Sequence, residues 1–480
     1  MLQILLIAFM FLYYGALITN GNFRIFGPTA EGLTFNSMLE HLLNGRFDVD
    51  PKAIGNEGFL RDGHVYAYQG IFCAVIRLPL LMFKGGLATN VTALSCLIAA
   101  CFAGAMKLRA ALFVRRHCQR SPVSESAFLL LAIYIVLGGA QVGYLRTSIY
   151  QEVAFWAAAL GAAFVYCAVK GIILDRFTPR LLAWMALLAG LALLTRVSTG
   201  IGLYAAIGLL LVALVIIDTV KDASMSHSLA VRLLAGILSW RVLLPSAILI
   251  AFLAVAGVVN FFRWGNPATF VEFSYYISNR SYPDRLDRMH TYGLFNVARI
   301  PFSLGYFFIP VWMFQRADGM LLFEAEQTRL FDAAELPPGS FFLTDLLPIV
   351  FIGFLIGSII HARLSKSISL GQILALAAGL AIPCILMLMA VYLAYRYRME
   401  FYPEIDLLAF LGFYAAISNG ESLAILRRYR VWIATATLVS IVSAQGALLL
   451  YKVSEFGPSQ PFLREGVFVH YYWGILKFLH

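Results

Sequence analysis

Three carboxylates in the first polar stretch of the chain have types and spacing suited to acid–base or metal chemistry. Glu31 begins an amphipathic segment that ends at Gly45, and Asp48 and Asp50 follow as an Asp-x-Asp pair. A positioned carboxylate can take a proton from an attacking hydroxyl as a general base. In extended backbone the Asp48 and Asp50 side chains would point the same way and could share a divalent cation. Two structural interpretations stay open: Glu31 could cap a helix or complement its dipole, and the Asp pair could belong to a solvated turn.

Three arginines occupy short polar breaks between apolar segments. Segment 181–195 would be only about 22 Å long as a helix, against a hydrocarbon core of about 30 Å, so Arg196 is expected below the membrane surface. An isolated cation at that depth is costly and tends to mark a functional cavity. Arg396 and Arg398 stand among tyrosines in Tyr395–Pro403. Arginine can bind a phosphate through two parallel hydrogen bonds, although snorkelling and an interfacial aromatic belt favour the same residue types.

The composition indicates what kind of scaffold must position these groups. Hydrophobic residues make up 61% of the 480 and charged residues 13%, whereas a soluble domain carries roughly a quarter charged residues. The sequence therefore predicts an all-α integral membrane protein with about eleven transmembrane helices and no separate soluble domain. The expected spans lie near 2–19, 87–106, 127–143, 153–172, 181–195, 201–217, 242–259, 346–361, 369–393, 405–418 and 431–450.

The net charge of +10 is explained by topology and does not indicate a nucleic-acid partner. With the N-terminus cytoplasmic, the five short inner connections hold sixteen Lys and Arg residues, whereas the three short outer ones hold only Arg146, Arg196, Arg396 and Arg398. This asymmetry satisfies the positive-inside rule. Two long outer segments, 20–86 and 260–345, carry fifteen of the 26 acidic residues. The polar chemistry is therefore expected on the outer face, where residues 451–480 form an outer tail.

The first outer segment is predicted to contain two helices that lie in the membrane interface. Residues 31–44 place Phe35, Met38, Leu39, Leu42 and Leu43 on one helical face, with Asn36, Glu40 and Asn44 opposite. Residues 67–84 are apolar but contain Gln69, Arg77 and Pro79, and counting them as a span would invert every later loop. Between the two, 59–68 is predicted to form a small hairpin around Asp62-Gly63.

One stretch resembles the GT-C superfamily of membrane glycosyltransferases, which includes the aminoarabinose transferase of lipid A and the protein O-mannosyltransferases. In that superfamily the first outer loop begins with an acidic pair, runs through a helix to a Gly and reaches a Pro shortly afterwards. Glu31, Gly45 and Pro51 follow this pattern, with Ala30 in place of the first acid. The late segment Arg396-Tyr397 with Glu400 and Pro403 is similar to an Arg-Tyr motif found near a late span in many members.

The resemblance implies transfer of a sugar from a polyprenyl-phosphate donor to an acceptor glycan, lipid or protein on the outer membrane face. It implies Glu31 as general base, with Asp48 and Asp50 as alternatives, and a lipid phosphate held by Arg196, Arg396 and Arg398. Aromatic rings stack on sugar C–H surfaces, so acceptor or sugar contacts are expected from Tyr66, Tyr68, Arg280 and Tyr397. No metal site is assigned, although a divalent cation could bind at Asp48 and Asp50. The expected location is a bacterial inner (plasma) membrane.

Two other function classes stay open. A polymerase or ligase that joins lipid-linked glycans would also place arginines and carboxylates outside. A transporter or lipid flippase would be expected to show internal repeats and interrupted helices in corresponding positions. The sequence has no clear internal repeat, and its polar residues gather toward one side of the membrane.

The predicted topology can be tested with single cysteines in a background that lacks the native thiols. Cysteines placed in 20–86 and 260–345 should react with a membrane-impermeant thiol reagent in intact cells, because these segments lie outside. Cysteines in 107–126 and 419–430 should react only after the membrane is opened. Labelling of 107–126 in intact cells would reverse the whole arrangement.

Overall fold

The computed structural model describes residues 2–118, 121–138, 147–221, 228–309, 329–334, 339–361, 368–418 and 420–453, and these are mostly helical. Each predicted membrane segment coincides with a helix of the bundle: α1 (Leu2–Ile18), α5 (Thr92–Arg116), α6 (Pro122–Leu137), α7 (Ile149–Ile173), α8 (Pro179–Leu193), α9 (Val197–Lys221), α11 (Trp240–Trp264), α16 (Leu346–Ile360), α17 (Leu370–Met389), α18 (Tyr402–Ser418) and α20 (Arg430–Val453).

Fewer of these helices have the length and hydropathy of a full membrane span. Within the described residues six qualify, or seven if α18 and α19 (Gly420–Arg428), which meet at a bend of 102°, form one broken span. The others, α1, α6, α8 and α16, are shorter apolar helices. A mostly helical membrane protein is therefore established, whereas a count of eleven spans is not. A 15-residue helix such as α8 rises only about 22 Å.

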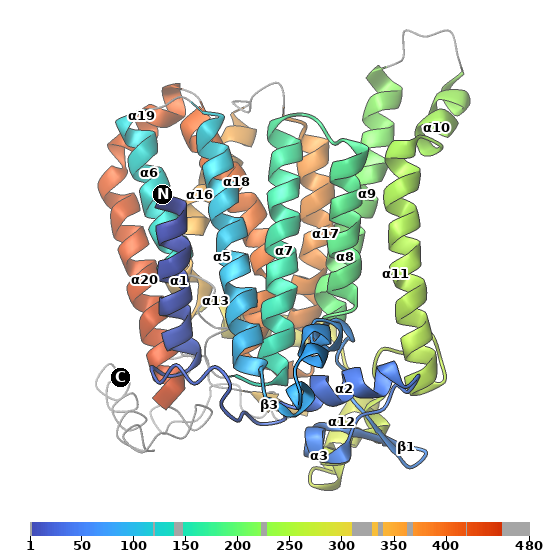
Figure 1. Cartoon of the computed structure of the whole chain (residues 1–480). Helices are drawn as coiled ribbons and strands as arrows, with labels where there is room; N and C mark the ends of the chain where they lie inside the picture. Colours follow the sequence, from blue (N-terminus) through green and yellow to red (C-terminus); the bar gives the residue numbers. More distant parts are fainter. Residues whose placement is uncertain are drawn as a thin grey trace.

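The long polar segments gather at one end of the bundle. In Figure 1, α2 (Thr34–Leu43), α3 (Pro51–Ile54) and α12 (Asp284–Tyr292) lie below the bundle, and α10 (Leu229–Ile237) and α19 lie at the upper end. The lower end is the predicted outer end, and the upper end carries the predicted cytoplasmic connections. Residues 454–480 of the predicted outer tail, and parts of the second outer segment, lie outside the described residues.

The predicted hairpin is confirmed in the first outer segment. Strand β1 (Phe59–Arg61) pairs with β2 (His64–Tyr66) antiparallel, with Phe59 opposite Tyr66. Both turn residues have positive φ, 49° at Asp62 and 79° at Gly63, as a type I′ turn requires. The predicted second interface helix is broken into a short α4 (Phe72–Val75) and a 3₁₀ turn, η2 (Leu78–Met82). Pro79 in the first turn of η2 has no N–H to extend a helix that begins earlier.

The amphipathic pattern predicted for α2 is confirmed in part: Leu43 of the predicted apolar face is 56% exposed, and part of the predicted polar face is buried. Phe35, Met38 and Leu39 are buried and Glu40 is exposed, as predicted. Asn36 was expected on the exposed side but is only 1% exposed. Its amide donates to the carbonyl oxygens of Leu87 and Thr89 at 2.9 and 2.8 Å. Both sides of α2 are covered because the rest of the first outer segment folds back over it.

A buried ion pair fastens this outer segment to the bundle. Arg77, which follows α4, donates to Glu152 Oε2 in the first turn of α7 at 2.8 Å, and to Asn36 Oδ1 at 3.1 Å. Arg77 and Glu152 are 2% and 0% exposed. Nearby, Phe72 N donates to Leu194 O at 2.9 Å, and a Cβ at Gly70 would lie 2.0 Å from that same carbonyl oxygen. The first outer segment thus packs directly against the ends of α7 and α8.

The two outer segments also pack against each other. Ile277 N donates to Gly58 O at 3.0 Å, and Phe59 forms an isolated antiparallel bridge with Tyr276. Arg61 donates to the carbonyl oxygen of Arg263 at 2.8 Å. Three 3₁₀ turns lie next to these contacts: η1 (Gly55–Glu57), η6 (Phe273–Tyr275) and η7 (Ile277–Arg280). The second segment also packs directly on the bundle, since Asn296 N donates to Met389 O at 2.9 Å.

Breaking the Arg77–Glu152 pair from one side should destabilise the protein strongly. Arg77→Met or Glu152→Met leaves one buried charge without its partner, a loss typically of about 3–5 kcal/mol. The double variant Arg77→Met/Glu152→Met should lose clearly less than the sum of the single losses, because neither charge then remains buried alone. Thermal unfolding of the purified protein in detergent measures this, with the exposed Arg116→Gln as control. Strictly additive losses would contradict the pairing.

Candidate functional site

Two of the three predicted donor-site arginines meet at one tyrosine ring. The guanidinium carbon of Arg196, just before α9, lies 5.4 Å from the ring centroid of Tyr397, and that of Arg396 lies 5.4 Å from the same centroid. Arg396 also lies over Tyr150, in the first turn of α7, at 4.9 Å. These residues come from three parts of the chain. They meet because the 3₁₀ segment η10 (Tyr395–Glu400) lies against the ends of α7 and α9.

The position of Arg196 is fixed by a carboxylate at the end of η10. Arg196 Nε is hydrogen-bonded to Glu400, which also accepts from Ser198 Oγ at 2.8 Å and from Thr199 Oγ1 at 2.5 Å. Glu400 is only 1% exposed, so its charge needs these donors. The sequence predicts an isolated cation at Arg196. In the structure its ion pair with Glu400 fixes the orientation of its side chain at the start of α9.

A second carboxylate, which the sequence analysis did not select, lies in the same group. Glu57 Oε2 accepts hydrogen bonds from the hydroxyl groups of Tyr150 and Tyr276, the latter at 2.6 Å. Burial raises the pKa of Tyr276 to about 12, and the hydrogen bond to Glu57 adds to this effect. The phenol therefore stays protonated and donates. Glu57 lies alone in the loop Gly55-Asn-Glu-Gly58, and no spacing in the sequence distinguishes it.

Tyr68, predicted as a sugar or acceptor contact, belongs to the group as well. Removal from water raises the pKa of its phenol, and Tyr397 adds to this shift while Arg196 and Arg396 oppose it. Tyr68 therefore lies within electrostatic range of all three. We call the following set the outer cluster: Glu57, Tyr68, Tyr150, Arg196, Tyr276, Arg396, Tyr397 and Glu400.

Arg398, the third predicted donor-site arginine, belongs to a different ion pair. It is fully buried and donates to Asp345 Oδ2 at 2.8 Å and to Gly339 O at 3.1 Å. Its guanidinium carbon lies 3.9 Å from the ring centroid of Phe341, in α15 (Phe341–Thr344). Tyr134 donates to the other oxygen of Asp345 at 2.6 Å. These contacts hold η10 in place, and a phosphate could reach Arg398 only if its ion pair opened.

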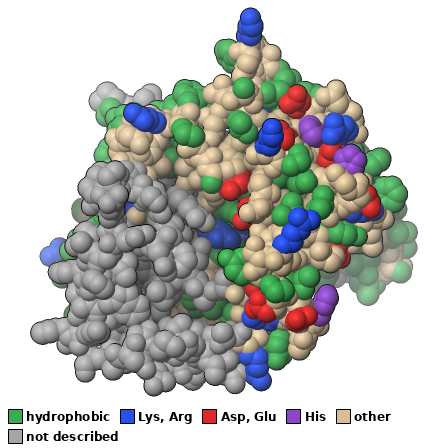
Figure 2. Space-filling model, turned by 90° about the horizontal axis from the view of Figure 1, so that it is seen from below, with side chains coloured by type: hydrophobic (Ala, Val, Ile, Leu, Met, Phe, Trp, Pro, Cys, Tyr) green, Lys and Arg blue, Asp and Glu red, His purple; other side chains and the backbone are tan. Residues whose placement is uncertain are grey.

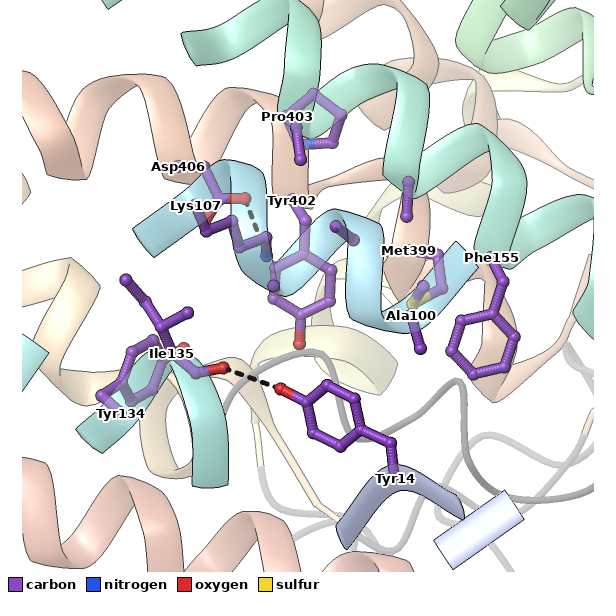
Figure 3. Close-up of a pocket in the computed structure, with 14 residues that line it drawn as sticks. Tyr14, Ala100, Lys107, Tyr134, Ile135, Phe155, Met399, Tyr402, Pro403 and Asp406 are labelled. Atoms are coloured by element: carbon purple, nitrogen blue, oxygen red, sulfur yellow. Dashed lines mark hydrogen bonds and ion pairs between the residues drawn. The ribbon is translucent and has the colours of Figure 1, made fainter. Parts of the chain in front are cut away.

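A pocket inside the bundle lies beside the start of α18 (Figure 3). Lys107 of α5 forms an ion pair with Asp406 at 2.8 Å, and its ammonium lies 4.9 Å from the ring centroid of Tyr402. In Figure 3 the hydroxyl groups of Tyr14 and Tyr402 point toward each other across the pocket. Together with the Arg398 contacts, the Lys107–Asp406 pair fixes both sides of the junction between η10 and α18.

The two aspartates of the Asp-x-Asp pair have separate partners. Asp48 is buried and receives hydrogen bonds from Arg46 Nε at 3.1 Å, His41 Nδ1 at 3.0 Å and His64 Nδ1 at 3.1 Å. Burial alone would raise the pKa of Asp48, but the hydrogen bonds from Arg46 and the two histidines outweigh it and hold the pKa well below its usual range. Asp50 is exposed and caps α3 by accepting from Lys52 N at 2.8 Å.

A divalent cation at this pair stays a prediction. Across the residues that the structure describes, no group of three or more His, Cys, Asp and Glu side chains could hold a metal ion. The oxygens of Asp48 already face three cationic or hydrogen-bonding side chains. A cation would therefore have to displace these donors.

The remaining predicted residues lie in the two outer segments, outside the outer cluster. Glu31 stands three residues before α2, outside its first turn, and has a left-handed backbone with φ of 51°. Tyr66, in β2, has its ring centroid 6.0 Å from that of Trp264. Arg280 is exposed at the end of η7. Seen from below, the outer face carries Lys and Arg, Asp and Glu, and His side chains among apolar ones (Figure 2).

Comparison with known proteins gives structural likenesses only. No family model and no curated protein matches the chain. The archaeal oligosaccharyltransferase AglB from Archaeoglobus fulgidus, in complex with an inhibitory peptide and a dolichol-phosphate, is similar at a TM-score of 0.45 and 12% identity, over 98% of this chain and 59% of AglB. ArnT from Cupriavidus metallidurans, bound to undecaprenyl phosphate, is similar at a TM-score of 0.38 and 13% identity, over 94% of this chain and 75% of ArnT.

This chain therefore spans just under three fifths of AglB and three quarters of ArnT. The structural similarity to both extends over nearly the whole of this chain.

Proposed function

We propose that this protein transfers a sugar from a polyprenyl-phosphate donor to a glycan, lipid or protein acceptor at the outer membrane face. The observation that carries this proposal is the meeting of Arg196 and Arg396 at the ring of Tyr397. Two guanidinium groups beside one aromatic ring suit a phosphorylated sugar, because arginine binds phosphate oxygens and the ring stacks on a sugar face.

In this reaction the acceptor hydroxyl attacks the anomeric carbon of the donor sugar. The bond from that carbon to the phosphate oxygen breaks, and the lipid phosphate leaves with the bonding electrons. Arg196 and Arg396 offset the charge that develops on the leaving phosphate, because fixed cations in a site poor in water interact strongly with an anion. Glu400 acts as a positioning residue, since it holds Arg196 together with Ser198 and Thr199.

The proton of the acceptor hydroxyl passes to a carboxylate, and we assign this role to Glu31. Its left-handed backbone is an uncommon conformation for a residue other than glycine, and such residues concentrate at functional sites. Glu57 is the second candidate because it lies inside the outer cluster. Two phenol groups donate to Glu57 Oε2, and three side chains donate to Asp48. Asp48 and Asp50 stay further alternatives for the base.

Loss of Arg396 should weaken donor binding more than loss of Arg398. A charge-assisted contact to phosphate contributes on the order of 1.5–3 kcal/mol, so Arg396→Ala should weaken binding of a polyprenyl-phosphate sugar by roughly 10-fold to 100-fold. Arg396→Lys should recover only part of the loss, because lysine lacks the planar fork. Binding is measured with the purified protein in detergent. Arg116→Ala, which removes an exposed arginine at the opposite end of the bundle, is the control. Unchanged affinity in both Arg196→Ala and Arg396→Ala would remove the donor assignment.

Loss of the base should stop turnover while donor binding persists. Glu31→Gln keeps the side-chain shape, so donor affinity and thermal stability should stay near normal while sugar transfer falls by roughly 100-fold or more. Glu57→Gln is the matched variant. An inactive, well-folded Glu57→Gln beside an active Glu31→Gln would move the base to Glu57.

Asp48→Asn and Asp50→Asn extend the same comparison to the other predicted carboxylates. Near-normal transfer in all four variants would leave the first outer segment without a catalytic base. Retained movement of the donor lipid across the membrane in a transfer-deficient variant would favour the flippase alternative instead.

A further inference from the structure

A polar hollow lies at the end of the bundle opposite the outer cluster. It is formed where the connection between α7 and α8 meets the ends of α9, α11 and α17, helices that run side by side on one flank in Figure 1. We call it the polar cup. Its polar lining consists of Asp175, Arg176, Thr178, Asp218, Arg241 and Gln372.

An apolar groove continues from the polar cup along the outside of the bundle. Thr178 and Pro179 line both hollows. The groove runs between α8 and α11 and is lined mainly by Trp184, Leu187, Trp240, Leu244, Ile248 and Phe252. It ends where the two helices touch, since a Cβ at Gly190 would lie 2.3 Å from the ring of Phe252. A charged hollow that opens into an apolar groove fits an amphiphile.

The charges of this region favour an anion. Three arginines, Arg176, Arg180 and Arg241, face two aspartates, Asp175 and Asp218, so the described lining residues have a net charge of +1. Arg241 is held by Asp218 Oδ2 at 2.6 Å and by Phe177 O at 2.8 Å. Arg176 and Arg180 form no ion pair with any residue that the structure describes, and both are exposed. The cup also receives the N-terminus of α8, whose dipole favours a negative charge.

The buried side chain of Gln372 is a second, independent observation that points to a polar ligand in the polar cup. Its side chain is only 3% exposed, yet Oε1 accepts no hydrogen bond from the described part of the chain. Its amide nitrogen lies 3.5 Å from Asp175 Oδ1, at the limit of a hydrogen bond. Buried polar atoms in native proteins are nearly always hydrogen-bonded. A hydroxyl group on a bound headgroup, such as that of a glycerol headgroup, would supply the missing donor, which the phosphate itself cannot.

The groove is open to the surrounding lipid at headgroup level. Trp184 and Trp240 are 51% and 66% exposed, and exposed tryptophans gather at membrane–water interfaces. The neighbouring α10 also exposes apolar side chains, among them Leu234 at 57% and Ile237 at 50%. From Trp240 to Phe252 the groove is about 18 Å long by helical rise, close to the thickness of one leaflet, about 15 Å. That length suits one acyl chain, whereas a polyprenyl chain would extend beyond it.

We propose that the polar cup and the apolar groove bind one anionic phospholipid of the adjoining leaflet. The phosphate sits in the cup near Arg176, Arg180 and the first turn of α8, and one acyl chain follows the groove past Trp184 and Trp240. Basic pockets between transmembrane helices are known to bind acidic lipid headgroups. This site is separate from the outer cluster and does not depend on the proposed glycosyl transfer.

Tryptophan quenching by brominated lipids tests the site in the full-length protein. The protein is placed in bilayer nanodiscs of phosphatidylcholine with a minor fraction of brominated phosphatidylglycerol or brominated phosphatidylcholine. The signal of the site is the quenching lost in Trp184→Phe/Trp240→Phe. We expect this component to favour phosphatidylglycerol by at least fivefold, the effect of about one basic residue near an acidic lipid.

Charge variants decide whether the preference comes from the cup. Arg176→Gln/Arg180→Gln should abolish most of the preference, because it removes both arginines that lack an ion pair among the described residues. Arg116→Gln/Arg427→Gln removes the same charge from exposed positions at the same end and should keep the preference. Equal quenching by both lipids, or equal loss in both double variants, would overturn the proposal. Displacement of phosphatidylglycerol by an equimolar polyprenyl phosphate would overturn the assignment to a phospholipid.

Discussion

The buried pair between Arg77 and Glu152 is the contact on which the outer half of the molecule depends. Both side chains are almost completely removed from water, so each charge requires the other, and their separation would leave an uncompensated ion in the interior. The pair fastens the first outer segment to the first turn of α7, the same turn that presents Tyr150. Glu57 and Tyr68, which belong to that segment, are therefore placed against the bundle by a contact formed outside the outer cluster.

A similar principle holds the late segment η10. Arg398 is fixed from one side by Asp345, and Glu400 is fixed from the other by Arg196, Ser198 and Thr199. Buried ion pairs and hydrogen bonds of this kind restrict the movement of the backbone that carries them. Arg396 and Tyr397 directly precede Arg398 in the same 3₁₀ segment. Their side chains are thereby held facing Arg196 and Tyr150, which is the arrangement required to receive an anionic group without large rearrangement.

The two ends of the bundle contain cations in different settings. At the outer end, arginines are packed against aromatic rings and carboxylates in a buried layer. At the opposite end, Arg176 and Arg180 are exposed beside an apolar groove and two tryptophans. The first setting suits a ligand that enters a fixed site, and the second suits a lipid that exchanges laterally with the bilayer. Acidic residues are concentrated in the outer segments and basic residues in the connections at the opposite end. The two ends of the bundle therefore differ in charge.

The sequence by itself determined the helical segments and the hairpin at Asp62-Gly63, because hydropathy and turn chemistry act over a few neighbouring residues. The sidedness of the loops stays a prediction from their charge bias. The sequence also identified Arg196, Arg396, Tyr397 and Tyr68 as candidate site residues, because cations and tyrosines are conspicuous in polar stretches between apolar helices. Only the tertiary structure decided that Glu57 joins them, that Arg398 pairs with Asp345, and that Asn36 is buried. These outcomes depend on contacts between segments 50 to more than 200 residues apart. Local sequence patterns do not show which distant segments pack together.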